Sequence, residues 1–168
     1  MYYKDFIQKI EKAGIGLADA RTFDVLILPE NIGSFEKVEE LFEALGAADL
    51  IKRLQEAGCK CASAFNFGVD VPALERRGSD RWLGCIWIRD MVAIPLVIGT
   101  LGSLLAMKIA ESPDRGQPPP SHPIVHARIV IGDVDGGFSF IDYDGDGKTL
   151  IKVLEGLKDV RKIAHAAE

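Results

Sequence analysis

Apolar residues in the first third of the chain follow helical spacing, then extended spacing, then helical spacing again. In residues 3–10 they recur at intervals of three and four and Gly14 follows, which predicts a short amphipathic helix. Residues 23–28 are almost wholly apolar and stop at a proline, a pattern typical of a strand covered on both faces. Residues 34–46 return to helical spacing between a capping serine and a glycine, and residues 50–54 predict a further helical turn.

The middle of the chain predicts two more strands and a long apolar helix. Residues 59–67 alternate, so one face of a strand would carry Cys59, Cys61, Phe65 and Phe67. Residues 83–88 are apolar on both faces, which indicates a central strand. Residues 91–107 carry no charged side chain and form the most hydrophobic stretch of the chain. We expect them to form a helix.

The last third changes in character. Residues 112–121 are rich in proline and polar side chains, which predicts a linker or loop. Residues 124–142 alternate on both sides of Asp135-Gly136, a dipeptide that favours a tight turn, and therefore predict a β-hairpin. Apolar residues return to helical spacing from about Lys148, so we expect the chain to close with a helix.

These elements predict an α/β (α+β) fold. It consists of a mainly parallel sheet of three or more strands with flanking helices, followed by a β-hairpin and a C-terminal helix. The length of 168 residues is typical of a single domain over residues 1–168. A subdivision into an α/β layer of residues 1–111 and a ββα unit of residues 122–168, joined by the Pro-rich loop 112–121, stays open.

Composition and charge narrow the class of protein. Apolar residues make up 48% of the chain and charged residues 27%, which is typical of a globular protein. Lys and Arg number 20 against 25 Asp and Glu, so the net charge is -5 and nucleic acid is not an expected partner. The N-terminus mixes charges into its first turns and lacks the apolar core of a signal peptide, so we expect a cytoplasmic location.

Cysteine and histidine spacings predict no metal centre or disulfide. The chain has three cysteines, an odd number, and Cys59 and Cys61 are separated by one residue. We expect these two to be small core residues, with a reactive or metal-binding role as the alternative. His122 and His126 are four residues apart at the start of a strand, where about 13 Å separates such positions, so one zinc ion cannot bind both.

An acidic segment precedes the last helix. Asp142, Asp144 and Asp146 alternate before Gly147, as in the first half of a calcium-binding loop. The twelfth position of such a loop should carry a glutamate and is Val153 here. We therefore expect no cofactor and a helix capped by Asp144 or Asp146, with Ca²⁺ in the 142–147 loop as the minor alternative.

Carboxylates near the predicted strand ends are candidate ligand-binding residues, since ligands of α/β folds bind at strand ends. These are Asp24, Glu30, Asp70 and Asp90. No catalytic residue is identified, because no serine in the chain has a glycine two positions away on both sides, as a nucleophile elbow requires. The sequence leaves open whether the chain is an enzyme, and the lack of a reaction motif favours a non-enzymatic role.

The apolar helix is also a candidate interface. Two pairs of small residues with a spacing of four, which allow close helix packing, lie on it: Gly99 and Ser103, and Gly102 and Ala106. Insertion of residues 91–107 into a membrane is the alternative, although a helix of this length spans about 25 Å against about 30 Å of hydrocarbon. We expect a buried core or oligomer-interface helix.

The order of elements over residues 91–158 resembles a known group of proteins. The apolar helix VAIPLVIGTLGSLLA, a polar linker, a hairpin turning at Asp135-Gly136, the strand FSFIDYDGDG and the helix TLIKVLEGL resemble the effector-associated adaptor modules of bacterial conflict systems. The resemblance implies an adaptor that joins sensors to effectors through protein contacts, and it implies no catalytic residues. The helix face from Gly99 to Ala106 would belong to the contact surface.

Three functions follow as hypotheses. The first is a non-enzymatic protein-interaction or adaptor domain, in a bacterial defence system, that self-associates or binds a protein partner. The second is a small α/β enzyme or nucleotide-ligand sensor with a site at the strand ends. The third makes residues 91–107 a membrane-inserting element.

Overall fold

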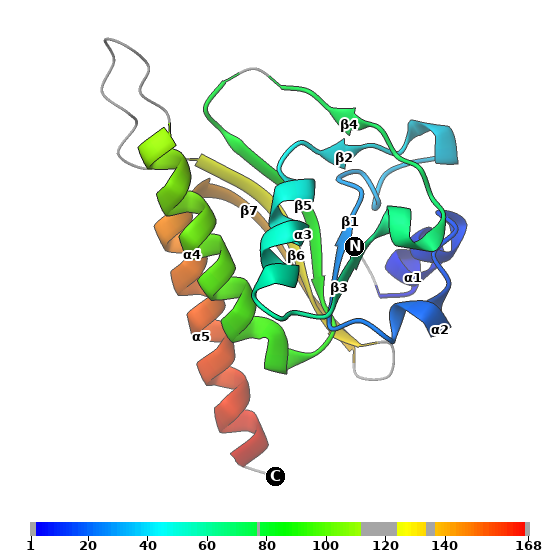
Figure 1. The fold of residues 1–168 in the computed structure, drawn as a ribbon. Helices are drawn as coiled ribbons and strands as arrows, with labels where there is room; N and C mark the ends of the chain where they lie inside the picture. The colour runs from blue at the N-terminus through cyan, green and yellow to red at the C-terminus, as the bar shows by residue number, and fades with distance from the viewer. Residues whose placement is uncertain (1–2, 77, 112–123, 134–136, 167–168) are drawn as a thin grey trace.

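The computed structural model describes residues 3–76, 78–111, 124–133 and 137–166 (Figure 1). The α-helices are α1 (Tyr3–Lys12), α2 (Leu17–Ala20), α3 (Ala47–Glu56), α4 (Ile94–Glu111) and α5 (Gly147–Ala166). Short 3₁₀ helices are η1 (Val38–Glu40), η2 (Ala64–Phe67) and η3 (Met91–Ala93). The strands are β1 (Val25–Leu28), β2 (Glu43–Ala44), β3 (Cys61–Ser63), β4 (Ala73–Leu74), β5 (Arg81–Ile88), β6 (Ile124–Asp133) and β7 (Gly137–Asp146).

The main sheet has five strands in the order β3-β1-β5-β6-β7, flanked by helices, so the α+β class is confirmed. The expectation of a mainly parallel sheet is wrong. β1 pairs in parallel with β3, and β5 with β6, whereas the β1–β5 and β6–β7 pairs are antiparallel. An apolar strand buried on both faces has the same pattern in either direction, so residues 83–88 predicted a central strand but not its orientation.

The hairpin is part of the main sheet rather than an appendage. β6 pairs with β5 from Arg81 to Ile88, and β6 and β7 pair along their whole length. The hairpin and the closing helix are therefore confirmed as elements, and they extend the sheet formed by the first half of the chain. The turn at Asp135-Gly136 and the expected loop 112–121 lie outside the described residues.

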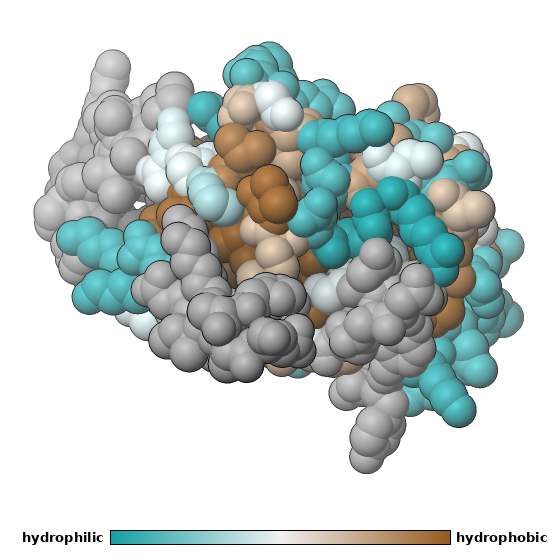
Figure 2. Space-filling view, turned by 90° about the horizontal axis from the view of Figure 1, so that it is seen from below, coloured by the Kyte–Doolittle hydropathy of each residue, from teal (hydrophilic) through white to brown (hydrophobic). Residues whose placement is uncertain are grey.

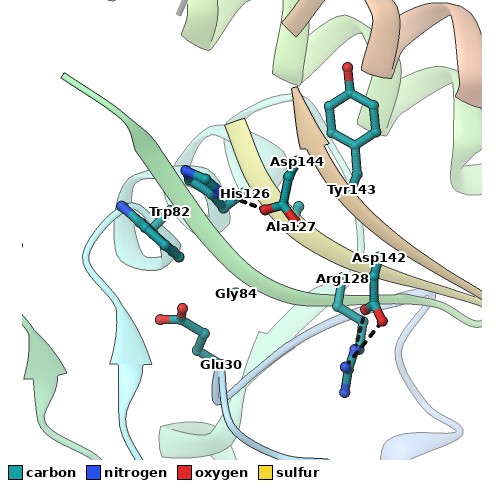
Figure 3. A pocket seen from close by; sticks show the side chains of 9 residues that line it. All are labelled: Glu30, Trp82, Gly84, His126, Ala127, Arg128, Asp142, Tyr143 and Asp144. Carbon is teal, nitrogen blue, oxygen red and sulfur yellow. Dashed lines mark hydrogen bonds and ion pairs between the residues drawn. The ribbon is translucent and has the colours of Figure 1, made fainter. Parts of the chain in front are cut away.

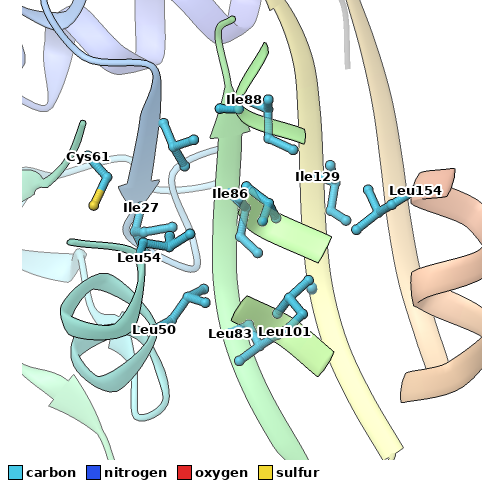
Figure 4. Packing of buried hydrophobic residues seen from close by; sticks show 14 of the residues in the cluster. Ile27, Leu50, Leu54, Cys61, Leu83, Ile86, Ile88, Leu101, Ile129 and Leu154 are labelled. Carbon is cyan, nitrogen blue, oxygen red and sulfur yellow. The ribbon is translucent and has the colours of Figure 1, made fainter. Parts of the chain in front are cut away.

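One face of the sheet is covered by α3, α4 and α5 (Figure 1). Side chains from these helices pack on alternate residues of the strands, and Figure 4 shows this cluster around Ile86 and Ile129 of the two middle strands. Leu54 of α3, Leu101 of α4 and Leu154 of α5 are all fully buried in it. The apolar helix predicted over residues 91–107 is thus confirmed as η3 and α4, and its inner face is core.

The opposite face is covered only in part. Phe6 of α1 packs edge-on against Trp87 of β5 and Phe140 of β7, with ring centroids 5.6 and 5.4 Å apart. In the hairpin this second cluster includes Val130 of β6 and Phe140 of β7, and it ends before Arg128 and His126. Beyond it, the strands carry His126 and neighbouring charged residues on a face that no helix of the described residues covers.

One expected element is wrong, and another is shorter than expected. Residues 34–46 do not form a helix: the chain turns, forms η1 and enters β2. The Asn31 side chain holds this loop, since it donates to Glu40 O at 2.9 Å and accepts from Phe42 N at 3.1 Å. The strand predicted over residues 59–67 is limited to β3, because η2 begins at Ala64 and leaves Phe65 73% exposed.

Candidate functional site

The four strand-end carboxylates do not form one site. Asp24 and Asp90 lie at the same end of the sheet, where Asp24 O accepts hydrogen bonds from the backbone of Arg89 and Asp90. Asp90 caps η3 through a hydrogen bond from Val92 N. Glu30 follows the other end of β1. Asp70 lies near Glu43, and the burial of Glu43, followed by the negative charge of Asp70, raises the pKa of the Glu43 carboxyl.

The three aspartates of the acidic segment have separate partners. They lie at alternate positions of β7, where Asp142 binds Arg128, Asp144 binds His126, and Asp146 caps α5. Asp146 accepts from Thr149 N at 2.9 Å and from Thr149 Oγ1 at 2.8 Å, so the capped helix is confirmed. Within the described part of the chain, no group of three or more potential ligands is arranged to hold a metal ion.

A polar pocket of about 300 Å³ lies where the uncovered face of the hairpin meets the loop after β1. Its floor is formed by β5, β6 and β7 (Figure 3). The floor depends on a bulge in β5 at Gly84, where a φ of +78° favours glycine and a Cβ would lie only 3.2 Å from Leu28 O. The pocket is lined by Glu30, Trp82, Gly84, His126, Ala127, Arg128, Asp142, Tyr143 and Asp144.

His126 is held between two carboxylates, an arrangement that we call the histidine clasp. Its Nε2 lies 2.8 Å from Asp80 Oδ2, and its Nδ1 is hydrogen bonded to Asp144 Oδ1 across the hairpin. Burial alone would lower the pKa of His126, but the hydrogen bonds to Asp80 and Asp144 outweigh it and raise the pKa. Both ring nitrogens donate when the imidazole is protonated, so the clasp favours the cation.

Trp82 forms the centre of a three-layer stack. The His126 ring lies 3.9 Å from the indole, at an interplanar angle of 17°. The guanidinium of Arg76 lies 3.7 Å from the indole centroid and is paired at 2.7 Å with Glu30. Because Arg76 precedes β5 and Glu30 follows β1, the stack ties two distant loops to the hairpin.

Arg128 and Asp142 form a second cross-strand pair next to the clasp. Arg128 Nε donates to Asp142 Oδ1 at 2.6 Å and Nη2 donates to Oδ2 at 3.3 Å (Figure 3). The hydrogen bond to Asp142 is the main cause that raises the pKa of the Arg128 guanidinium. Tyr143 alternates with Asp142 and Asp144, and its ring points away from them toward the helices.

A second hollow of about 260 Å³ lies between α3 and α4, and we call it the α3–α4 groove. Two of the predicted interface residues, Gly99 and Ser103, line it, and both are exposed. Gly102 is half-buried on another side of α4, where a Cβ would lie 3.8 Å from Ile151 of α5. The backbone of Ala106 belongs to α4, and its side chain lies outside the description.

Two exposed apolar side chains lie at the start of α4, and one of them, Leu96, lines this groove. Val92 of η3 is 80% exposed and Leu96 of α4 is 37% exposed. Figure 2 looks at the end of the molecule where η3 leads into α4, and it shows apolar side chains gathered between hydrophilic flanks. An exposed apolar surface of this kind is typical of a site of contact with another molecule.

The sequence pattern missed the histidine clasp, although part of the signal was present. A hairpin centred on Asp135 places His126 opposite Asp144 and Arg128 opposite Asp142, which is the observed register. Asp80 and Trp82 could not be found in this way. They reach the hairpin through the pairing of β5 with β6, which joins residues more than forty positions apart.

Comparison of the chain with protein-family models, with curated proteins and with solved structures found no match. Among the described residues, no helix combines the length and the hydrophobicity that a membrane span needs.

Proposed function

We propose that this chain is a protein-interaction domain that self-associates through the α3–α4 groove. The observation that carries the proposal is the groove itself, with Leu96, Gly99 and Ser103 on its α4 side. A non-enzymatic role fits the polar pocket as well, because each charged side chain that lines it is bound to another charged side chain.

Small residues at this place favour close approach of another helix. A Cβ built on Gly99 would meet nothing within 4 Å, so the surface above it is open. Gly99 and Ser103 are one turn apart on the exposed side of α4. Two helices that cross at such residues bring their backbones close together and gain contacts along the crossing.

The charges of the groove favour a second copy as the occupant. Arg53 and Glu56 both lie on its α3 side, and Arg53 also pairs with Asp49 at 3.3 Å. In a two-fold arrangement each copy would bring the same two charges of opposite sign to the contact. The charges of the groove therefore suit a second copy of the chain. The proposal also includes an adaptor role in a bacterial defence system. Only the resemblance of residues 91–158 to adaptor modules supports that role.

Size-exclusion chromatography with light scattering tests the proposal on the full chain. We expect twice the mass of one chain for the unmodified protein and one chain mass for Gly99→Arg, whose long side chain would block the crossing. Gly156→Arg is the matched control, since Gly156 is also an exposed glycine of a helix with nothing within 4 Å of a Cβ. Arginine favours the helix at both positions.

Three outcomes would contradict self-association at this site. They are an unmodified chain that stays monomeric at all concentrations, a Gly99→Arg variant that keeps the full mass, and a Gly156→Arg variant that loses it. Gly102 is unsuitable for this test because it lies against Ile151, so a larger side chain there would disturb the packing of α4 on α5.

Binding of a small polar ligand in the pocket around His126 is the second candidate function. The concave shape of this site and its mixed charges favour it. A thermal-shift panel of nucleotides and divalent cations would test it on the unmodified chain and on Arg128→Ala. We expect a ligand of this pocket to raise the melting temperature of the first and not of the second. No shift with any member of the panel would contradict it.

A further inference from the structure

The two edges of the main sheet differ in length. β3 forms one edge with three residues and β7 forms the other with ten, and each pairs with a single neighbour among the described strands. Figure 1 shows β7 as the outermost strand, next to β6. A long edge strand is a template for a further strand, because about half of its N–H and C=O groups point away from the sheet.

The outer side of β7 is open along its second half. In an antiparallel pair the N–H and C=O groups of successive residues point to alternate sides, so β6 binds every second residue of β7. Over residues 141–145, the described part of the chain provides no backbone partner for the groups that point outward. These groups are left to water or to an added strand.

The two faces of this edge carry different side chains. Asp142 and Asp144 lie on the open face, where their side chains are 67% and 71% exposed. Ile141 and Tyr143 lie on the helix-covered face and are half-buried, whereas Ile129, the partner of Ile141 in β6, is fully buried. The alternation therefore gives the outer half of the strand an acidic face and an apolar face.

We infer that β7 binds an extended segment of another protein, in which two basic residues flank one apolar residue, and that this segment adds a sixth strand to the five-stranded sheet. Its two basic side chains lie opposite Asp142 and Asp144, and its apolar side chain lies opposite Tyr143 on the other face. The pairing is antiparallel, which is the more stable direction per residue. This surface is separate from the α3–α4 groove, so the inference goes beyond self-association.

The charges of β7 argue against a second copy of the chain as the occupant. A two-fold pairing of β7 with itself centred on any residue of 142–144 places an aspartate of one copy opposite an aspartate of the other, which is destabilising. A pairing centred on Ile141 places Asp142 opposite Phe140. Neither arrangement gives the aspartates an opposite charge, whereas a basic segment does.

The aspartates have room for a second cation. On the β6 side Asp142 binds Arg128 and Asp144 binds His126. Because both aspartate side chains are mostly exposed, a lysine or arginine of an added strand can approach them as well. The net charge of -5 on the whole chain also favours the approach of a basic segment.

A seven-residue peptide tests the pairing on the full chain. Acetyl-Thr-Lys-Val-Lys-Val-Val-Thr-amide places its lysines opposite Asp144 and Asp142 when it pairs antiparallel with residues 139–145. By isothermal titration calorimetry, we expect it to bind at least about tenfold more tightly than the same peptide with glutamate in place of both lysines. Two further peptides carry N-methyl groups on alternate sets of amides. Only the one whose donors toward β7 are intact should bind.

Hydrogen exchange measured by NMR locates the binding site. In the free chain, β6 should protect every second amide from residue 139 to residue 145, and the amides between them should exchange quickly. The lysine peptide should slow this second set by about tenfold or more and leave the amides of α3 unchanged.

Variants of the chain test the role of charge. Asp142→Asn combined with Asp144→Asn keeps the hydrogen-bond acceptors and should weaken binding of the lysine peptide by about two- to thirtyfold. Asp19→Asn combined with Asp70→Asn is the control, because it changes the net charge equally at exposed aspartates outside the main sheet. Gly99→Arg should bind the peptide like the unmodified chain, so a failure of self-association is distinguishable from a failure of this inference.

Four results would overturn the inference. They are a lysine peptide that does not bind, equal binding of the lysine and glutamate peptides, binding that leaves the exchange of the β7 amides unchanged, and β7 amides that are all protected in the free chain. Protection that increases with protein concentration and without peptide would also overturn it, since it would assign the edge to a second copy.

Discussion

The two faces of the β6–β7 hairpin stabilise the protein in different ways. On one face Val125, Ile129 and Ile131 are buried beneath the helices. On the other face the same strand carries His126 and Arg128, each bound to an aspartate of β7 that is mostly exposed. Burial of apolar area depends little on pH or salt, whereas ion pairs and protonated histidines depend on both. The helix-covered face should therefore provide most of the free energy of unfolding. The open face should determine how that free energy changes with pH and salt.

Truncation of a core side chain should have the largest effect. Leu101 of α4 is fully buried among the side chains of both middle strands, so Leu101→Ala removes apolar contacts and leaves a cavity. We expect it to lower the free energy of unfolding by about 2 to 5 kcal/mol, measured by urea unfolding. Leu45→Ala is the matched control, because Leu45 is 54% exposed, and it should change the stability by less than about 0.5 kcal/mol. An equal loss of unfolding free energy in the two variants would show that the helix-covered core does not dominate the stability.

The histidine clasp should give an intermediate effect that depends on pH. The pKa of His126 is raised above its ordinary value of 6.5, so the folded protein binds this proton more tightly than the unfolded chain does. The resulting stabilisation is complete below about pH 6.5 and is lost as the pH rises through the raised pKa. Urea midpoints measured from pH 6 to pH 9 should therefore fall with increasing pH.

His126→Gln is the variant that isolates this effect. Glutamine cannot carry the proton, so the part of the decrease in urea midpoint that comes from His126 should disappear. Any decrease that comes from other titratable groups should remain. Asp80→Asn removes only one of the two carboxylates and should give a smaller fall than the unmodified chain. A slope that is the same in the unmodified chain and in His126→Gln would show that the clasp does not contribute.

Local patterns predicted the elements that long apolar runs define. Four elements contain enough buried positions for their sequence pattern alone to predict helix or strand. They are the strand at residues 23–28, the central strand, the apolar helix and the hairpin. The failures occurred where a polar side chain or a turn decided the structure. Asn31 closes the loop that was expected to be a helix, and its two hydrogen bonds reach nine and eleven residues along the chain.

The candidate sites were harder to predict than the elements. The interface residues of α4 could be named from small-residue spacing, but the spacing did not indicate that Gly99 faces the groove while Gly102 faces α5. The polar pocket depends on Glu30, Trp82 and His126, which come together only through strand order and register. The hydrophobic pattern of a single segment does not predict which strands pair over a long range.

The smallest effect is expected at the second cross-strand pair. The side chains of Arg128 and Asp142 are 31% and 67% exposed, so water screens their attraction. A double-mutant cycle with Arg128→Ala and Asp142→Ala should give a coupling of about 0.2 to 1 kcal/mol that weakens in high salt, because salt screens exposed charges. A coupling as large as the loss in Leu101→Ala would mean that the open face also sets the stability, and the contrast between the two faces would then be wrong.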